Sequence, residues 1–492
     1  MVAAKPTRDP CLCRPVPVDP CQGGPSGRSG TSGPTARIRG TVWTGEEPGR
    51  RPWFPDWSGN EQGRHIRRTA PPVKICLDAR LVSGEAGGTE SVVLGMAAGL
   101  SRLDDSDDTY YFLTYREQAD WLLPYVHGPC RPLWTAPWAP PPRQLGRIRA
   151  VAKKALPPVA AAWRRRPRPD LPWLQAGPPP TDGIAERAGA QLMHFTFQTG
   201  FRTDLPSIYQ PHDLQQIHLP SLFSARERAR REKWYGSLCR RAKMVAVVST
   251  WTQQDVMRHF RLSEDIVRVV PLAPIVAEYR SPTAADLESL GKRLRLPQAF
   301  IFYPAQTWPH KNHIGLLEAL AWLRDREGLV VPFVSSGRLG EFFPVIERRV
   351  EELGLQDQVT WLGFVTPDDL MGLYRLARAV IIPTRFEAAS GPLWDAFLSG
   401  TPVACSKVTS LPAQAGDAAL LFDQEQPEEI AQAIRRLWVD GELRSLLIDR
   451  GRANVARFNW DLTARHFRAH YRRLLNQMTD ADRDILSQPP LL

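Results

Sequence analysis

The chain has 492 residues, of which 43% are hydrophobic, and a formal net charge of +11. Its length allows two or three globular domains, and no run reaches the ~20 apolar residues that a membrane span needs. The N-terminal residues lack the apolar segment of a secretory signal. The seven cysteines are scattered and match no common zinc spacing, so we expect a reduced, cytosolic setting and no metal site.

The positive charge is concentrated in two segments. Residues 1–72 contain 11 Lys and Arg against 6 Asp and Glu, and residues 143–168 contain 9 against none. The rest of the chain is therefore close to neutral, which disfavours a nucleic-acid-binding protein built on a basic fold. Residues 1–72 also hold 12 Pro and 10 Gly with few periodic apolar positions, so we predict a disordered extension there.

A first α/β domain is predicted at residues 73–272, because strand-like and helical patterns alternate there, as in a parallel sheet. Its strands are predicted at 73–79, 110–115, 191–197, 205–211 and 244–249. Residues 129–180 contain 14 prolines and many basic side chains, so we predict that they are an insertion in this domain. The acidic cluster Asp104–Asp108 is predicted to be a solvated helix end.

The first strand leads into a loop with Gly87, Gly88 and Thr89, which precedes a helix that runs to about Leu103. This spacing does not match a dinucleotide-binding fingerprint, so by itself it is weak evidence of a phosphate site.

Three histidines of this domain differ in their placement. His212 follows a strand directly, at the end of a parallel sheet where clefts form, so a catalytic role and a structural role are equally open. His194 lies within a strand, so we predict that it belongs to the core. His218 has no assigned role.

A second alternating series fills residues 273–453, after a linker near 271–296. Its strands are predicted at 299–305, 330–335, 359–364, 379–383, 402–405 and 419–422. An amphipathic, aromatic-rich helix is predicted at 454–475, in the final segment 454–492.

Two loops of the second series carry polar groups suited to a sugar nucleotide. Strand 299–305 precedes Gln306 and Lys311, and Lys311 lies at the head of a predicted helix, where it offers a point charge to a diphosphate. Strand 379–383 precedes Glu387 and Asp395, which flank a helix N-terminus whose free N–H groups bind anions. Carboxylates accept hydrogen bonds from sugar hydroxyls. Each of these residues also has a plain structural interpretation, as a surface lysine or a helix-capping acid.

The pairing of Pro309-His-Lys-Asn312 with Phe386-Glu-x7-Asp-Ala-Phe-x2-Gly-Thr-Pro-Val resembles the retaining glycosyltransferases of family four, also called glycosyl transferases group 1. The resemblance covers about residues 73–475. It implies the GT-B fold, in which two Rossmann-like, doubly wound parallel-sheet domains face a central cleft. The first domain would bind the acceptor and the second the donor, and the last helix would cross back to the first domain.

The resemblance also implies roles for single residues. Glu387 would face the transferred sugar, Asp395 the ribose hydroxyls, and His212 would lie against the transferred sugar. The loop with Gly87, Gly88 and Thr89 would lie near the donor phosphate and the acceptor. The predicted catalytic residues are thus His212, Lys311 and Glu387. The predicted donor-binding residues are Gln306, Lys311, Glu387, Ser390, Gly391, Pro392 and Asp395.

Two positions depart from the family pattern. Gln306 stands where many relatives have Arg, so neutralisation of the diphosphate would depend on Lys311 and loop N–H groups, with His310 as a further candidate. Asp395 stands where the pattern has Glu, which shortens its reach by about 1.5 Å, one bond length.

The function implied by the resemblance is metal-independent hexosyl transfer with retention, from a nucleotide-diphosphate sugar to a glycan or lipid-linked acceptor, as in surface polysaccharide assembly. We expect no cofactor beyond the donor substrate and no nucleic-acid partner. The basic insertion could contact an anionic membrane surface on the cytoplasmic side, or be a solvated loop. The alternatives are a non-catalytic sugar-nucleotide-binding protein and a GT-B sugar-nucleotide epimerase.

Overall fold

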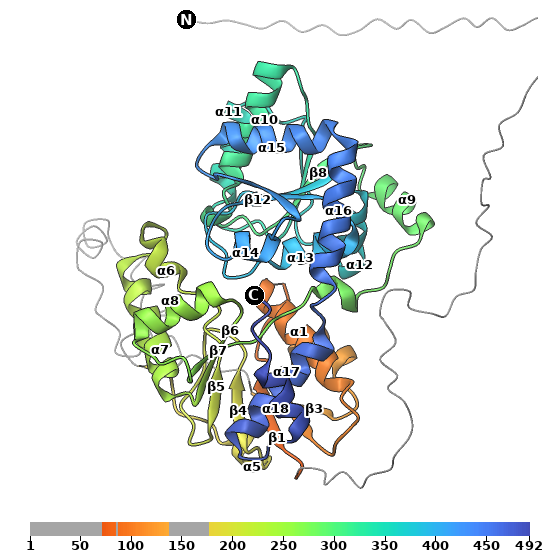
Figure 1. Cartoon of the computed structure of the whole chain (residues 1–492). Coiled ribbons are helices and arrows are strands. Elements are labelled where there is room, and N and C mark those ends of the chain that lie inside the picture. The colour runs from red at the N-terminus through yellow and green to blue at the C-terminus, as the bar shows by residue number, and fades with distance from the viewer. Residues whose placement is uncertain (1–70, 85–86, 137–176) are drawn as a thin grey trace, which may run out of the picture. The chain divides into compact units, whose positions relative to one another are not determined.

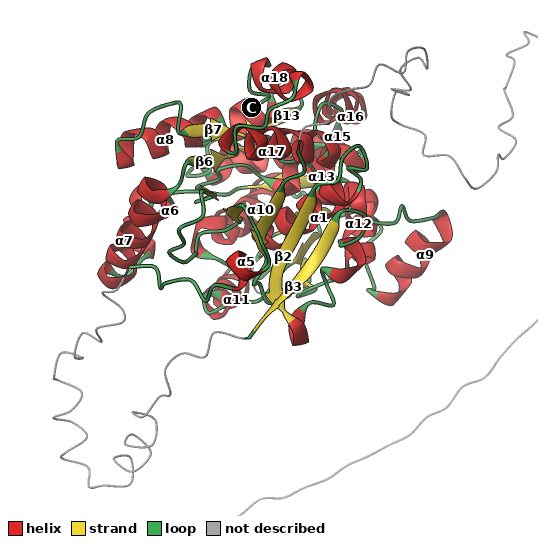
Figure 2. Ribbon diagram, turned by 90° about the horizontal axis from the view of Figure 1, so that it is seen from below, coloured by secondary structure: helices red, strands yellow, loops and turns green. Residues whose placement is uncertain are grey.

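The computed structural model describes residues 71–84, 87–136 and 177–492, and every structural statement below concerns these residues. They all belong to one compact unit. They form two parallel sheets, each covered by helices (Figure 1). Figure 2 shows the strands as inner layers with the helices outside them. The predicted extension at 1–72 and the basic segment 143–168 lie almost wholly outside the described residues.

The first sheet has seven strands in the order β3-β2-β1-β4-β5-β6-β7, all parallel. The order reverses between β1 and β4, so the loops after these strands diverge at the carboxyl edge. The strands are β1 (Lys74–Asp78), β2 (Thr109–Tyr115), β3 (Cys130–Thr135), β4 (Leu192–Phe195), β5 (Ser207–Tyr209), β6 (Met244–Val247) and β7 (Val267–Val269).

Helices of the first half connect these strands. Ser224 caps α7 and Ser249 caps α8, each by accepting a hydrogen bond from a backbone N–H of the first turn, a group that otherwise has no partner. The α-helices are α1 (Gly88–Ser101), α5 (Ile184–Arg187), α6 (Gln215–His218), α7 (Ala225–Arg241) and α8 (Thr250–Phe260). The short 3-10 helices are η1 (Arg116–Gln118), η2 (Leu123–Tyr125) and η3 (Pro220–Leu222).

The second sheet has six strands in the order β10-β9-β8-β11-β12-β13 and is also parallel. Its order reverses between β8 and β11, which is where ligands bind in doubly wound sheets. The strands are β8 (Ile301–Pro304), β9 (Phe333–Ser336), β10 (Val359–Trp361), β11 (Ala379–Ile382), β12 (Val403–Ser406) and β13 (Ala419–Phe422).

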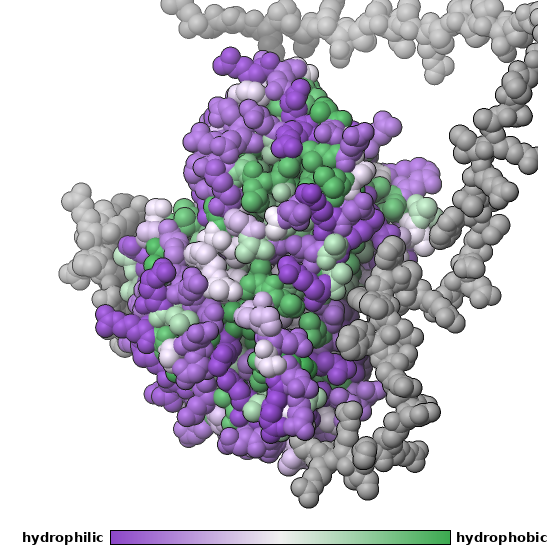
Figure 3. All heavy atoms as spheres, in the orientation of Figure 1, coloured by the Kyte–Doolittle hydropathy of each residue, from purple (hydrophilic) through white to green (hydrophobic). Residues whose placement is uncertain are grey.

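The helices of the second half follow its strands in turn, as a doubly wound sheet requires. They are η4 (Ile275–Glu278), α9 (Ala284–Arg293), η5 (Pro309–Lys311), α10 (His313–Glu327), α11 (Phe343–Glu352), α12 (Pro367–Leu376), α13 (Gly391–Ser399), α14 (Leu411–Ala415), α15 (Pro427–Val439) and α16 (Gly441–Val455). Figure 3 shows a mostly hydrophilic face, with hydrophobic spheres gathered over the region of α15 and α16.

The chain then returns to the first sheet through α17 (Trp460–Leu474) and α18 (Asp480–Ser487). Figure 1 shows α17, in dark blue, beside α1, in orange. Two glycines of α1 make this contact possible: a Cβ at Gly95 would lie 1.9 Å from the indole of Trp460, and one at Gly99 would lie 2.3 Å from its carbonyl oxygen. The indole N–H of Trp460 also donates to the carbonyl of Pro274 at 3.1 Å.

Three expectations from the sequence are corrected. The segment 129–180 is not an insertion throughout, because β3 (Cys130–Thr135) pairs with β2 inside it. The last helix does not begin at 454: α16 ends at Val455, and Asn459 caps a separate helix, α17. The linker region near 271–296 contains the helix α9.

The acidic cluster before β2 is solvated at Asp104, Asp105 and Asp107, as predicted, but the prediction is wrong for Asp108. Asp108 is 3% exposed, and it accepts hydrogen bonds from the backbone N–H of Val73 at 2.9 Å and from Arg472 of α17 at 2.8 Å. Asp105 pairs with Arg468, which lies one turn before Arg472 on α17. The acids therefore fix α17 on the first sheet. His194 is a core residue, as predicted, and its ring nitrogens lie 2.7 Å from the Tyr471 hydroxyl and 2.9 Å from Gln210.

Candidate functional site

The two predicted donor loops meet at the point where the strand order of the second sheet reverses. One follows β8 and the other follows β11, which are neighbouring strands. The carbonyl of His310 accepts hydrogen bonds from the backbone N–H of Arg385 at 2.8 Å and from the Thr384 hydroxyl at 3.2 Å. The loops therefore form one hydrogen-bonded unit.

Lys311 and Glu387 form a salt bridge within this unit. Lys311 Nζ lies 2.5 Å from Glu387 Oε1, and the two side chains are only 21% and 12% exposed. Burial raises the pKa of Glu387, and the ammonium of Lys311 opposes this shift. A diphosphate at this place would bind the ammonium of Lys311, and a sugar hydroxyl would donate to the carboxylate of Glu387. A sugar nucleotide could therefore give each of the two side chains a new partner in place of the other.

The backbone around Glu387 is held by hydrogen bonds from residues that follow β12. The carbonyl oxygen of Glu387 accepts hydrogen bonds from the hydroxyls of Thr409 and Ser410, the latter at 3.0 Å. The side-chain amide of Gln414 bonds both the N–H and the C=O of Ser390, at 2.8 and 2.7 Å. These bonds fix the loop between the two predicted acids.

The start of α13 offers unoccupied donor groups beside this loop. Ser390 precedes the helix, and Gly391 and Pro392 are its first two residues. The buried Ser390 hydroxyl has no hydrogen-bond partner among the described residues. Apart from its chain neighbours and the backbone of its own helix, no described atom lies within 4 Å of the place that a Cβ of Gly391 would take. The N-terminus of α13 is therefore open to close approach by an anion.

Asp395 does not reach this open region in the structure. It lies in the second turn of α13, it is 4% exposed, and its carboxylate accepts a hydrogen bond of 3.4 Å from the backbone N–H of Val276 in η4. Burial raises the pKa of Asp395 to about 7, against the opposing effect of the nearby backbone N–H groups. The contact of Asp395 with a ribose stays a prediction.

Gln306 connects the donor loop to the glycine-rich loop of the first half. Its Oε1 accepts the indole N–H of Trp308 at 2.8 Å, and its Nε2 would lie 3.0 Å from a Cβ at Gly87. Gly87 has a φ of 56° and precedes α1, in which Gly88 and Thr89 are the first residues. The sequence of the loop with Gly87, Gly88 and Thr89 was weak evidence of a phosphate site. In the structure this loop lies directly against Gln306, a predicted donor-binding residue.

His310 is a poor candidate for neutralising a diphosphate. Burial, with the neighbouring Lys311 as a secondary cause, lowers its pKa to about 2. The ring is therefore neutral near pH 7 and supplies no charge to this site.

His212 lies three residues after the end of β5 and has a constrained conformation. Its φ is 61°, a left-handed value uncommon for residues other than glycine. Its Nε2–H donates to the carbonyl of Thr196 at 2.8 Å, which fixes the ring and leaves Nδ1 for another partner. Burial lowers the pKa of His212. A strained, oriented histidine at a sheet edge is typical of functional sites.

Asp213 is a candidate site residue that the sequence reasoning missed. Burial raises its pKa, and the charge of Lys311 is among the influences that lower it. In turn, Asp213 raises the pKa of Glu387. The carboxyl of Asp213 therefore lies near the salt bridge. Its position next to His212 was the signal that could have identified it.

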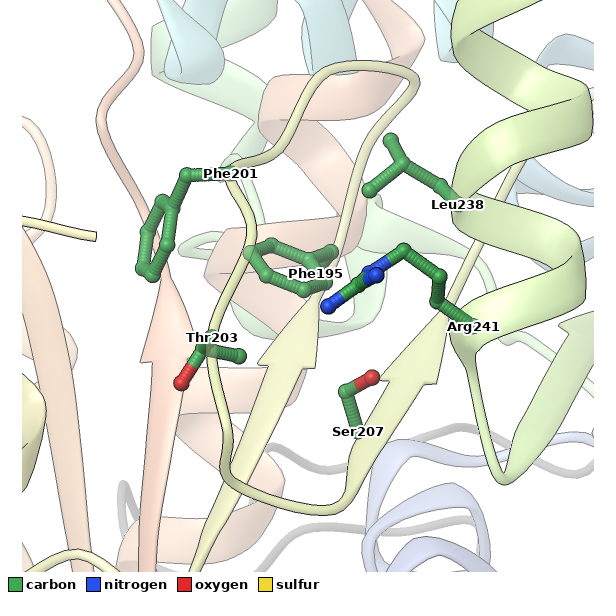
Figure 4. A pocket seen from close by; sticks show the side chains of 6 residues that line it. All are labelled: Phe195, Phe201, Thr203, Ser207, Leu238 and Arg241. Carbon is green, nitrogen blue, oxygen red and sulfur yellow. The ribbon is translucent and has the colours of Figure 1, made fainter. Parts of the chain in front are cut away.

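A cavity in the first half lies away from these residues. It has a volume of about 270 Å³ and is lined by Phe195, Phe201, Thr203, Ser207, Leu238 and Arg241 (Figure 4). None of the predicted site residues lines it, so it forms no part of the candidate site.

Comparison with known sequences gives a family model and several relatives. The model described as glycosyl transferases group 1 matches residues 290–454, which include both donor loops. The chain is 31% identical over 268 residues to the O-antigen chain mannosyltransferase B of Escherichia coli, a match that covers 52% of this chain and 70% of the relative. It is 26% identical over 281 residues to a D-inositol 3-phosphate glycosyltransferase of Corynebacterium jeikeium (strain K411), covering 55% and 67%.

Comparison with solved structures identifies the fold. Sucrose-phosphate synthase from Thermosynechococcus elongatus matches with a TM-score of 0.61 and 19% identity, over 82% of this chain and 99% of that chain. Anabaena HepE, solved in complex with UDP and glucose, matches with a TM-score of 0.60 and 17% identity, over 82% and 100%. The two parallel-sheet halves are thus those of the GT-B fold, as predicted.

Proposed function

The chain belongs to the glycosyl transferases group 1 family, and from this premise we propose that it transfers a sugar from a nucleotide-diphosphate sugar to a glycan or lipid-linked acceptor with retention and without a metal ion. Family membership makes the chain a glycosyltransferase, so the non-catalytic alternative loses its support. The nature of the donor, the acceptor and the stereochemistry belong to the proposal.

The observation that carries the proposal is the salt bridge of Lys311 and Glu387 beside the open N-terminus of α13. A diphosphate needs positive charge and N–H groups, and both are present within this unit. A sugar needs hydrogen-bond acceptors of fixed position, and Glu387 supplies one. The site thus matches both parts of a sugar nucleotide.

The reaction follows from this arrangement. The bond between the sugar C1 and the diphosphate oxygen breaks, and Lys311 with the N–H groups of α13 stabilises the charge that develops on the leaving group. The acceptor hydroxyl forms the new bond to C1 from the same face. Its proton passes to the leaving phosphate oxygen, and Glu387 orients the sugar. Because these groups already stabilise the diphosphate, the proposed step requires no metal ion.

His212 and the glycine-rich loop are proposed to act on the sugar and acceptor side. The carbonyl of Thr196 fixes the His212 ring, so it can donate or accept at one defined place. Gly87 lies against Gln306, so the loop that begins α1 borders the donor loop. We propose that an acceptor reaches the sugar between these two parts.

Surface polysaccharide assembly is proposed as the setting, because the similar Escherichia coli protein is named an O-antigen chain mannosyltransferase. Within the part of the chain that the structure describes, no helix has the length and apolar character to cross a bilayer. We propose that the basic segment 143–168, which lies outside the described residues, holds the enzyme peripherally on an anionic membrane surface, at ~1 kcal/mol per basic residue.

Donor binding tests the proposal. Calorimetry with UDP-, GDP- and ADP-sugars should identify one donor, and Lys311→Ala should weaken it at least about tenfold, because a hydrogen bond to a charged group contributes ~1.5–3 kcal/mol. Glu387→Gln should lower turnover more than binding. Lys292→Ala is the control, because it removes an exposed lysine that pairs with Glu288 on α9.

The proposal fails if no nucleotide sugar binds, or if Lys311→Ala and Lys292→Ala behave alike. An epimerase would convert the bound nucleotide sugar without any acceptor, so product formation that requires no acceptor would favour that alternative.

A further inference from the structure

His218, to which the sequence assigned no role, packs against two aromatic rings from different halves of the protein. Its ring centroid is 5.2 Å from that of Trp251 on α8 and 5.3 Å from that of Phe386. Its Nε2 lies 2.8 Å from Asp255 Oδ2, also on α8, so the orientation of the imidazole is fixed. These spacings are within the range in which aromatic rings attract each other.

Phe386 belongs to the donor loop and directly precedes Glu387. It is 2% exposed, and its ring meets that of Trp251 edge-on at 5.7 Å. On the other side of Glu387, the carbonyl of Ala388 accepts a hydrogen bond of 3.0 Å from the hydroxyl of Ser249. The residues on both sides of Glu387 are thus held by the first half of the protein.

We propose that His218 is a positioning residue for glycosyl transfer: with Trp251 and Asp255 it clamps Phe386, and thereby sets the place of the Glu387 carboxylate relative to His212 and Asp213. The inference rests on the proposed function, because it gives Glu387 the sugar-facing role. His218 itself touches neither donor nor acceptor in this proposal.

The reason for a clamp at this place is geometric. Glu387 comes from the second half, whereas His212 and Asp213 come from the first, so their spacing depends on contacts between the halves. The hydrogen bonds from Thr409 and Ser410 fix the backbone of Glu387 only within the second half. The rings of Phe386, His218 and Trp251 provide the contact across the halves next to the carboxylate. Small errors in such placement reduce catalysis strongly.

The clamp can be tested with variants that keep or remove the ring. His218→Ala should lower kcat about tenfold, because the misplaced carboxylate acts in the transition state, while the KM for the donor changes less than about threefold. His218→Phe keeps a ring against both Trp251 and Phe386, so it should retain more of kcat than His218→Ala. Phe386→Leu should resemble His218→Ala, and the double variant should be no worse than either single one.

His259 supplies a matched control on α8, the helix that carries Trp251 and Asp255. It lies 2.7 Å from Glu232 and meets the ring of Phe260 edge-on at 4.7 Å, so it has the same kind of acid and ring partners without contacting the donor loop. His259→Ala should leave kcat within about twofold, because the catalytic geometry is untouched. Equal losses in His218→Ala and His259→Ala, full activity of His218→Ala, or additive losses in the double variant would overturn the proposal.

Hydrogen exchange gives a readout that needs no turnover. The amides of residues 385–390 should exchange faster in His218→Ala than in the wild type, and at the wild-type rate in His259→Ala. An unchanged exchange rate in His218→Ala would overturn the clamp even if the enzyme transfers sugar normally. A different outcome is that the exchange differs as expected but the wild type transfers no sugar. The proposed function then fails. The contact of His218 with Phe386 would be structural only, so its positioning role in catalysis would be overturned as well.

Discussion

Asp395 should make the stability of the protein depend on pH in a direction opposite to that of most acids. Burial raises its pKa from 3.8 to about 7 in the folded state. The folded protein therefore binds this proton more tightly than the unfolded chain does. Its contribution to stability is complete below pH 3.8 and is lost as the pH rises through 7.

The magnitude follows from the two pKa values. Their difference of about three units corresponds to ~4 kcal/mol, at ~1.4 kcal/mol per unit. Between pH 8 and pH 5 the folded state takes up the proton while the unfolded chain stays mostly ionised, which accounts for ~2.5 kcal/mol of that total. Asp395→Asn has nearly the same shape but cannot titrate, so it lacks this term.

Urea unfolding of both proteins at pH 5, 6, 7 and 8 measures the effect. The free energy of unfolding of the wild type, relative to Asp395→Asn, should rise by ~2.5 kcal/mol from pH 8 to pH 5. The slope of each curve against urea should stay the same, because the surface exposed on unfolding does not change. A constant difference between the two proteins across this range would refute the reasoning, since the carboxyl would then titrate alike in both states.

Three further predictions concern other parts of the chain. Gly95→Ala should lower the unfolding free energy by ~1–3 kcal/mol, because its Cβ would overlap the indole of α17; an unchanged Tm would contradict this packing. Arg472→Met should lower the free energy of unfolding by ~3–5 kcal/mol, because it leaves the buried Asp108 without its cation. Breaking the exposed pair of Arg483 with Asp480 should lower it by less than ~1 kcal/mol. Equal losses in denaturant unfolding would argue against a buried pair. Wild type should float with anionic vesicles but not with neutral ones, and deletion of residues 143–168 should abolish this flotation; equal flotation of wild type with both kinds of vesicle would end the membrane proposal.

The fold could be predicted from the sequence because its strands are short apolar runs separated by helical segments. The strands that bear the donor loops, β8 and β11, were found close to their observed bounds. β3 was missed because Pro132 lies within it and prolines surround it. Proline removes a backbone donor, which is tolerated on an edge strand, and β3 is at the edge of its sheet.

The contacts that the sequence could not supply are the long-range ones. Asp108 was expected to be solvated because its partner, Arg472, follows 364 positions later. The burial of Asp395 likewise depends on η4, which is remote in sequence. The roles of His212, Lys311 and Glu387 stay predictions, although the structure brings the last two together.

The return of α17 to the first sheet has a consequence during synthesis of the chain. Arg468 contacts Asp105 across 363 positions, so the ribosome must add all of them after Asp105 before the contact can form. At ~5–20 residues per second this takes roughly 20–70 s. For that time the glycine-lined face of α1 lacks its partner and exposes apolar surface. The half of the protein that is made first is therefore completed last, and it is the half for which we expect nascent chains to need a chaperone.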